Sequence, residues 1–316
     1  LFSIMIFIIA SLGCFFSTKF EFFIFFRLLQ ASIAAGFLMS RVIIRDITSE
    51  NEAASMIGYV TMGMSIIPLF APGLGGLIQM LVGWPSIFLI MSLLGLLLFL
   101  LVYRDLGETK TIKINKNKKS SVSYIYLFKE LKFWGYSLTL AFSAGTFFSF
   151  LGGAPYIATK VYELNSVVSG LVMGFPAAGY FFGNYLSGRY SKLYGKDFMA
   201  LRGILLVIFG MFICLLITVF YRDTPYFFFG LCSFVGLGNG LIIPNASVGI
   251  LSVNENLSGT AGGIGNAIMI GTGAILASLT SYLLENQTSS SYLVIIMLLS
   301  GILSYSSFFI LVLKNK

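Results

Sequence analysis

The sequence predicts an all-α polytopic membrane protein, and three observations lead to this prediction. Hydrophobic residues make up 57% of the 316 residues and charged residues only 10%, whereas soluble domains carry roughly 25% charged residues. Mean hydropathy is +0.93. The apolar runs are also too long and too continuous for the alternating strands of a β-barrel. A soluble enzyme and a nucleic-acid-binding domain are therefore excluded.

Charge-free runs predict ten transmembrane helices along the chain. A span needs about 20 apolar residues, so the third run is long enough for two. Gly83-Trp84-Pro85 predicts the turn between them, because Gly and Pro favour turns and Trp favours the membrane interface. The second run is interrupted only by Arg27. The nine runs are 1–18, 22–40, 53–103, 133–159, 164–188, 203–221, 224–254, 256–284 and 286–313.

The basic residues predict the orientation of these spans. Sixteen of the twenty Lys and Arg residues fall in one set of alternate loops and the C-terminal tail. The opposite set holds three, Lys19, Lys160 and Arg222. Because cytoplasmic loops are enriched in Lys and Arg, the first set is predicted to be cytoplasmic, with both ends of the chain on that side of the membrane. This topology accounts for the net charge of +8 without a nucleic-acid partner.

One long polar connection divides the chain into unequal parts. Residues 104–132 are rich in Lys, Asn and Ser and predict a cytoplasmic linker that can touch anionic lipid headgroups. Residues 1–103 then form the remainder of an N-terminal helical half with four spans, and residues 133–316 form a C-terminal half with six. Because the sequence starts inside an apolar run at Leu1, the asymmetry suggests that two helices precede it.

The residues needed for most enzyme and cofactor chemistry are missing from the spans. The sequence has no His, and its three Cys residues lie inside apolar runs without the spacing of a zinc or disulfide framework. The glycines from Gly259 to Gly273 do not form a dinucleotide loop, because no strand precedes them. We therefore expect no catalytic residue, no metal and no cofactor.

Arg27 is the one ionisable residue well inside a span, about 10 Å from its outer end. A charge at that depth is costly and usually faces a cavity or a partner. Alternatively, the side chain extends to the outer headgroups. Gln30 lies on the same helical face as Arg27 and favours the cavity interpretation.

Prolines and glycines predict a bend in the following helix. Pro68, Pro72 and Gly76 are four residues apart, with Gly73 and Gly75 between them. Proline removes a backbone donor and bends a helix, and glycine allows helices to approach closely. The alternative is a small-residue packing face with no role in transport.

Charges of alternating sign follow the second span at its cytoplasmic end. They are Arg41, Arg45, Asp46, Glu50 and Glu52. These residues are interpreted either as a gate that closes through salt bridges or as a solvated loop that anchors the topology.

Polar and helix-breaking residues in the second half mark a candidate substrate path. Pro155 and Tyr156 follow two glycines and are expected to break a span near its outer end. Asn239 and Asn245, together with Pro244, are expected to interrupt another. Interrupted helices and intramembrane Asn side chains often line such a path, whereas hydrogen bonding between helices is the alternative.

Several of these motifs resemble the major facilitator superfamily, and within it the bacterial drug-resistance exporters of the Bcr/CflA type. The stretch from Arg27 to Ala31, followed by Arg41 to Asp46, resembles that group's RxLQAxG…RAxxRD signature in the fourth helix. The stretch from Pro68 to Gly76 resembles its antiporter motif in the fifth helix.

Two further stretches resemble family motifs less closely. Gly83-Trp84 with Ile87-Phe88 resembles the GWRxIF that follows the antiporter motif, with Pro85 where the family usually has Arg. Residues 188–197 resemble a degenerate copy of the first cytoplasmic-loop motif, with Lys192 where an Asp is typical.

The resemblance implies twelve helices in two halves around a central cavity, of which this chain aligns with the last ten. It also implies proton-coupled efflux of amphipathic drugs by alternating access, with a small-molecule substrate, protons and the lipid bilayer as partners, and we expect a monomer. Arg27 would then belong to the coupling or cavity-gating machinery, and Pro72, Gly73, Gly75 and Gly76 to the bend on which the halves rock. The acidic residue that the group's first helix usually supplies has no counterpart in the ten spans.

Two alternatives to drug efflux remain open. The chain could transport a single metabolite, with Asn239 and Asn245 selecting it. It could also be a truncated remnant that inserts into the membrane without transporting anything.

Overall fold

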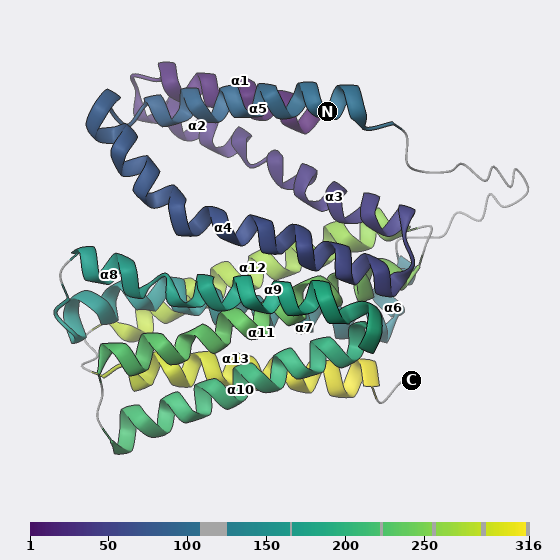
Figure 1. Cartoon of the computed structure of the whole chain (residues 1–316), viewed down its shortest axis with the longest axis vertical. Coiled ribbons are helices and arrows are strands. Elements are labelled where there is room, and N and C mark those ends of the chain that lie inside the picture. Colours follow the sequence, from purple (N-terminus) through teal and green to yellow (C-terminus); the bar gives the residue numbers. More distant parts are fainter. Residues whose placement is uncertain (108–124, 165, 222–223, 255–256, 286–288, 314–316) are drawn as a thin grey trace, which may run out of the picture. The chain divides into compact units, whose positions relative to one another are not determined.

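The computed structural model describes residues 1–107, 125–164, 166–221, 224–254, 257–285 and 289–313. Most of the predicted linker therefore lies outside the described residues. Every regular element within the described ranges is a helix (Figure 1), which confirms the all-α prediction. The chain forms two compact units, one of Leu1–Ile47 and Phe70–Ser120 and the other of Thr48–Leu69 and Ser121–Lys316. The division between these units falls at Ile47/Thr48, inside the helix Glu50–Val82 at Leu69/Phe70, and at Ser120/Ser121 in the predicted linker.

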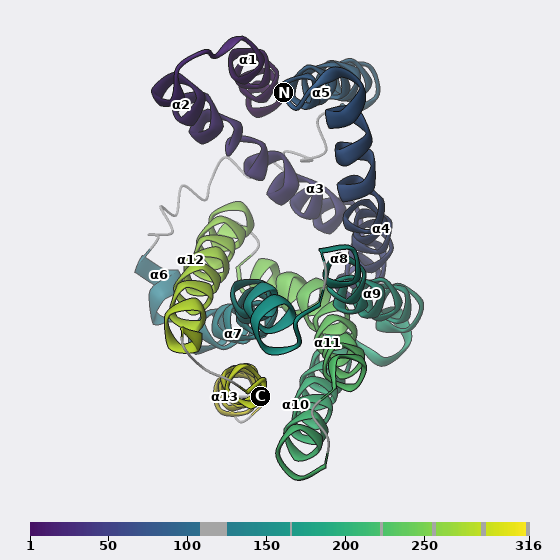
Figure 2. The ribbon, with the colours of Figure 1, turned by 90° about the vertical axis from the view of Figure 1, so that its left-hand side faces the viewer.

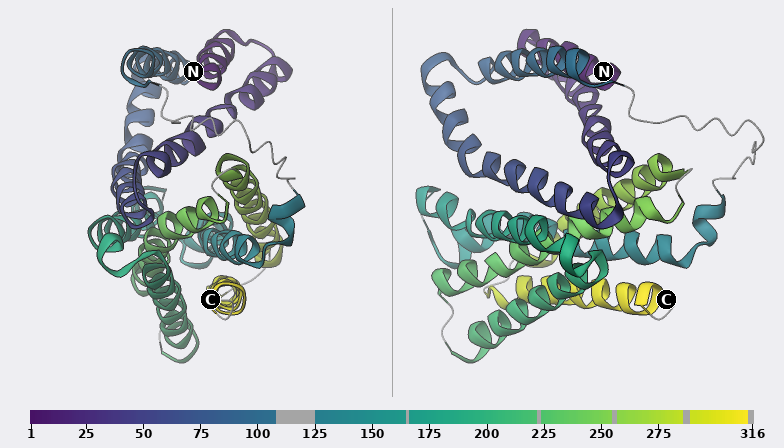
Figure 3. Two further views of the ribbon diagram at one scale, coloured as in Figure 1. Left: turned by 90° about the vertical axis from the view of Figure 1, so that its right-hand side faces the viewer. Right: turned by 45° about the vertical axis from the view of Figure 1, so that its right-hand side comes forward.

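The first unit contains α1 (Phe2–Phe16), α2 (Phe20–Gln30), α3 (Ile33–Ile47), the later part of α4 (Glu50–Val82) and α5 (Ser86–Asp105). Helix α1 packs along α5 and also contacts α2 and α3 (Figure 3). The stretch predicted as the second span forms two helices, because the regular hydrogen bonding of α2 ends after Gln30. There the amides of Ala31 and Ser32 donate to the carbonyls of Leu28 and Leu29 at 3.2 and 3.1 Å.

The turn predicted at Gly83-Trp84-Pro85 is confirmed. Helix α4 ends at Val82 and α5 begins at Ser86. Gly83 has φ +85°, a conformation that glycine adopts without the steric cost that other residues incur. Trp84 then packs edge-to-face against Phe23 and Phe88, with ring centroids 5.7 and 6.1 Å away.

The second unit is built around α7 (Leu131–Tyr156), which contacts α11 (Pro225–Ser252), α12 (Ser258–Leu284) and α13 (Ser291–Phe308). Figure 2 shows these helices side by side. Fully buried Phe133, Phe150, Phe228 and Phe229 contribute the largest side chains to its core. The remaining elements are α6 (Ile125–Lys129), η1 (Ile157–Val161), α8 (Ser166–Val172), α9 (Phe175–Tyr194), α10 (Lys196–Phe220) and η3 (Phe309–Leu313).

Helix α11 is continuous from Pro225 to Ser252, so the interruption expected near Asn239 and Pro244 is wrong. The glycines there serve close packing. A Cβ at Gly236 would collide with the carbonyl of Pro176 on α9, and one at Gly183 would collide with the carbonyl of Leu237. A proline inside a membrane helix is tolerated where neighbouring helices cover the backbone group it leaves unbonded.

The expected break at Pro155 and Tyr156 also differs from the structure. Pro155 lies inside α7, and the chain continues from Tyr156 into the π-helical turn η1. A Cβ at Gly152 would lie 2.5 Å from the Ala277 carbonyl of α12. The glycines before Pro155 therefore permit close packing at this point, while the proline coincides with a widening of the helix.

Seven helical stretches of the described chain are long and apolar enough to cross a membrane. They confirm a polytopic membrane protein, whereas the count of ten spans stays a prediction. Many large apolar side chains on them are exposed, including Leu94 at 61% and Phe209 at 57%. The stretches are Phe20–Ile47, Ser86–Asp105, Leu131–Val161, Lys196–Phe220, Pro225–Ser252, Ser258–Leu284 and Ser291–Val312.

The glycine packing between α9 and α11 makes a prediction about stability. Gly236→Ala places a methyl group against the Pro176 carbonyl and 2.7 Å from the Tyr180 nitrogen, and such overpacking typically costs about 1–3 kcal/mol. We expect Tm in detergent to fall by several degrees.

Gly230→Ala on the same helix is the matched control, because a Cβ there meets nothing within 4 Å. The higher helix propensity of Ala should leave its Tm unchanged or raise it. Equal shifts in the two variants would contradict the packing argument.

Candidate functional site

Arg27 and Gln30, predicted to share one face, contact each other in the structure. The Nη1 atom of Arg27 donates a hydrogen bond of 2.9 Å to Oε1 of Gln30. Both residues belong to the last turn and a half of α2. The Arg27 guanidinium carbon also lies 5.6 Å from the centre of the Phe88 ring on α5. Arg27 as a residue is exposed, while its guanidinium contacts groups on two helices.

Gln30 extends this contact to α1. Its Nε2 atom donates a 2.8 Å hydrogen bond to Oγ of Ser11, which is completely buried, while Gln30 itself is 5% exposed. The sequence analysis did not single out Ser11, which lies in an apolar run, and it named Phe88 only as part of a family motif, without pairing it with Arg27. We call Ser11, Arg27, Gln30 and Phe88 the arginine cluster; it joins α1, α2 and α5 through polar and cation–π contacts.

The chemistry of the arginine cluster is electrostatic. A guanidinium stays protonated at physiological pH and offers only donors, so Arg27 cannot itself release a proton. It can lower the pKa of a carboxyl group that comes close, because a nearby opposite charge favours the ionised form. The hydrogen bond to Gln30 and the contact with the Phe88 ring fix the position of the charged group.

The predicted gate residues lie in the last two turns of α3. Arg41 is 6% exposed, Arg45 is half-buried and Asp46 is exposed. Arg41 and Arg45 are one helical turn apart and so share a face. Their role as a gate stays a prediction.

A salt bridge lies next along the chain, at the start of α4. Nζ of Lys192 on α9 lies 2.6 Å from Oε1 of Glu52, and Ser49 donates a 3.1 Å hydrogen bond to the other carboxylate oxygen. Hydrogen bonding from Lys192, more than from Ser49, holds the pKa of Glu52 below its ordinary value. Lys192 is the residue that departs from the family motif, and the sequence analysis did not pair it with Glu52.

Helices α4 and α9 approach closely beside this salt bridge. A Cβ at Gly58 would lie 2.5 Å from the Gly188 amide nitrogen. Thr61 Oγ1 donates to Asn184 Oδ1 at 2.5 Å, and Ser55 donates to the Gly188 carbonyl. The first part of α4 is therefore held to α9 by backbone proximity, hydrogen bonds and one ion pair.

The antiporter-motif residues all lie within α4, but most of their side chains are not described. Pro68, Pro72, Gly73 and Gly76 fall in this group. Gly75 is described, and a Cβ on it would meet nothing within 4 Å. The bend at these residues stays a prediction.

The two asparagines of the candidate substrate path are buried and hydrogen-bonded between helices. Asn239 accepts from Ser143 and donates at 3.3 Å to Thr146, both on α7. Asn245 donates to Ser187 on α9 at 2.9 Å and to the Leu241 carbonyl at 2.7 Å. These contacts agree with the helix-packing alternative, and their role in a substrate path stays a prediction.

Comparison with known proteins identifies the chain's relatives. The family model described as Major Facilitator Superfamily matches residues 1–278. The chain is 29% identical over 198 residues to an uncharacterized MFS-type transporter, YdgK, of Bacillus subtilis, which is 60% of this chain and 49% of that protein.

Other relatives carry names that refer to drug resistance. A bicyclomycin resistance protein homolog of Haemophilus influenzae is 26% identical over 78% of this chain and 63% of its own length. Multidrug resistance protein D of Escherichia coli is 27% identical over 85% of this chain and 67% of its own length. The matches thus span about half to two thirds of these relatives.

A solved structure has the same fold. The crystal structure of the human organic anion transporter MFSD10 (TETRAN) superposes with a TM-score of 0.70, covering 98% of this chain and 75% of that chain. The sequence identity is 16%, so this likeness concerns the fold alone.

The Glu52–Lys192 salt bridge predicts a pH-dependent stability. A carboxyl group whose pKa is lowered on folding stabilises the protein above its unfolded pKa, and this contribution is lost as the pH falls through the lowered value. We expect Lys192→Gln to lower Tm at pH 6–8, and the gap to the unsubstituted protein to close below about pH 4.

Thermal unfolding in detergent from pH 3 to 8 measures this gap. Lys160→Gln removes the same charge from η1 and serves as the control. A gap that is independent of pH, or equal in the two variants, would show that the ion pair does not stabilise the fold.

Proposed function

The chain belongs to the major facilitator superfamily, and from this premise we propose that it acts in the proton-driven export of amphipathic drugs or toxic small molecules across the bacterial inner membrane. The names of its bacterial relatives, which refer to bicyclomycin and multidrug resistance, support this substrate class. The distribution of basic residues supports a cytoplasmic location for both ends of the chain.

The arginine cluster is the observation that carries the proposal. It places a permanent positive charge within a span and ties it to two neighbouring helices through Gln30 and Phe88. In antiport, a carboxyl group near such a charge would bind a proton only weakly and release it when the surroundings change. Arg27 and Gln30 would therefore tune the proton affinity of a carboxyl group that approaches them, a group that the ten spans themselves do not supply.

Alternating access requires contacts that form in one state and break in the other. We assign the gate to the cytoplasmic end, where Arg41, Arg45 and Asp46 end α3 and the Glu52–Lys192 ion pair joins α4 to α9. An exposed ion pair is weak, so it can break within a transport cycle. The Thr61–Asn184 hydrogen bond between the same helices adds to the closed state.

In this proposal, helix α4 bends at its prolines and glycines during transport. Pro68, Pro72, Gly73, Gly75 and Gly76 form a stretch in which backbone hydrogen bonds are lost and side chains are small. Such a stretch bends more easily than a regular helix. We propose that the rocking of the two halves takes place at this stretch.

Replacement of Arg27 tests the proposed coupling. A lysine keeps the charge but lacks the planar set of donors that bonds Gln30 while facing Phe88, and a lost hydrogen bond to a charged group costs about 1.5–3 kcal/mol. We expect Arg27→Lys to reduce export about tenfold or more. The measurement is accumulation of a fluorescent amphiphile such as ethidium in cells that lack other exporters and express the protein containing this chain.

Two controls make the result interpretable. Lys19→Ala removes a basic residue at the start of the same helix and should export normally. Dissipating the proton gradient should abolish the difference between expressing and non-expressing cells. Full export by Arg27→Lys, or no export of any amphiphile by the unsubstituted protein, would refute the proposal. Competition assays that find only one transported compound would support the single-metabolite alternative.

A further inference from the structure

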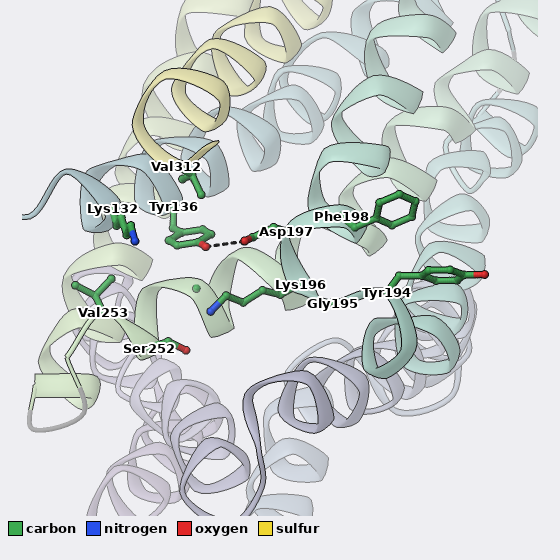
Figure 4. A pocket seen from close by; sticks show the side chains of 11 residues that line it. Lys132, Tyr136, Tyr194, Gly195, Lys196, Asp197, Phe198, Ser252, Val253 and Val312 are labelled. Atoms are coloured by element: carbon green, nitrogen blue, oxygen red, sulfur yellow. Dashed lines mark hydrogen bonds between the residues drawn. The ribbon is translucent and has the colours of Figure 1, made fainter. Parts of the chain in front are cut away.

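The second unit contains a cavity of about 530 Å³ that takes no part in the transport proposal. It lies where α7 and α10 begin and α11 ends, which is the predicted cytoplasmic end of these helices. Lys132 and Tyr136 of α7 line it together with Lys196 and Asp197 of α10. Figure 4 shows the two α10 side chains extending toward Tyr136.

Both lysines lie at positions that the helices themselves disfavour. Lys132 is the second residue of α7 and Lys196 is the first residue of α10. The amino terminus of a helix carries a partial positive charge, so a cation in the first turn is unfavourable there. Glu130 at the N-cap of α7 and Asp197 in the first turn of α10 offset part of this repulsion. An anion in the cavity would offset more of it.

The aromatic ring between the charges is held in place. Tyr136 is 5% exposed, and its hydroxyl donates a 2.6 Å hydrogen bond to Oδ1 of Asp197. Nζ of Lys196 lies 5.8 Å from the centre of the same ring, within the range of a cation–π contact. Asp197 thereby orients the ring on which the Lys196 amino group lies. The cavity is thus a built arrangement of three coupled side chains.

The charges and the walls of the cavity indicate the chemistry of its ligand. The two lysines and Asp197 sum to one positive charge, which attracts a negatively charged phosphate group. Val253 and Val312 supply apolar surface on the same cavity. A topological bias toward Lys and Arg explains basic residues anywhere in these loops, but it does not explain why two lysines line one cavity, with the amino group of Lys196 over the Tyr136 ring.

We propose that this cavity binds a phosphate group through Lys132 and Lys196. The group can be the headgroup of an anionic phospholipid of the cytoplasmic leaflet or a soluble phosphate compound. The proposal does not depend on the transported substrate, so it can fail while the export proposal stands, and the reverse.

Ligand-dependent thermal unfolding of the purified protein tests the proposal. The probes are phosphatidylglycerol, zwitterionic phosphatidylcholine, inorganic phosphate and glycerol 3-phosphate, all at matched ionic strength. A ligand that binds only the folded state raises Tm. We expect a rise of about 5 °C with the bound phosphate compound, and at least half of it should be lost in the double variant Lys132→Gln/Lys196→Gln.

Two further variants test whether the response depends on positive charge at the cavity itself. Lys160→Gln removes one charge far from the cavity and should respond as the unsubstituted protein does. Lys196→Arg keeps the charge and should retain the response. Without ligand, the double variant should be at least as stable as the unsubstituted protein, because two cations have left helix amino termini.

Each outcome decides the question. A lysine-dependent rise with phosphatidylglycerol alone supports the proposal and identifies a lipid ligand. A lysine-dependent rise with glycerol 3-phosphate or inorganic phosphate supports it and identifies a soluble ligand. Equal responses in the double variant and the unsubstituted protein, or an equal rise with phosphatidylcholine, would overturn it.

Discussion

Within a bilayer, polar groups have no water to bond, so each must find a partner inside the protein. The helix contacts of this chain follow from that constraint. Asn239 reaches two hydroxyls of α7, Asn245 reaches Ser187 of α9, and Gln30 reaches Ser11 of α1. Such bonds require the backbones to come close, and glycines such as Gly183 and Gly236 allow that approach. Polar side chains and glycines therefore determine which helices pair.

The same constraint gives the arginine cluster its functional interest. A guanidinium within a span is costly unless polar and aromatic groups surround it. Here Gln30 and Phe88 contact the Arg27 side chain, which is otherwise exposed, and Gln30 in turn is hydrogen-bonded to Ser11. This arrangement stabilises the charge without neutralising it, so the charge remains available to act on a titrating group. At the predicted cytoplasmic end the requirement differs, because water competes there and the Glu52–Lys192 pair can form and break at low cost.

Much of this architecture could be predicted from the sequence, because hydrophobic runs and turn residues act locally. The helices, the turn at Gly83 and the shared face of Arg27 and Gln30 all follow from residues close together in the chain. The continuity of α11 could not be predicted. A proline such as Pro244 and glycines like those around Asn239 occur both in interrupted helices and in continuous helices that pack closely. The partners Ser11, Phe88 and Lys192 could not be predicted either, since each lies far along the chain from the residue it contacts.

Drug movement driven by an imposed pH gradient tests the account most directly. The purified protein containing this chain would be reconstituted into vesicles with an acidic interior, and uptake of a labelled amphiphile would be followed. Antiport predicts that the drug accumulates in the acidic interior as protons leave, that uptake ceases when the gradient is dissipated, and that Arg27→Lys slows it. Uptake at the same rate with and without the gradient would contradict proton coupling.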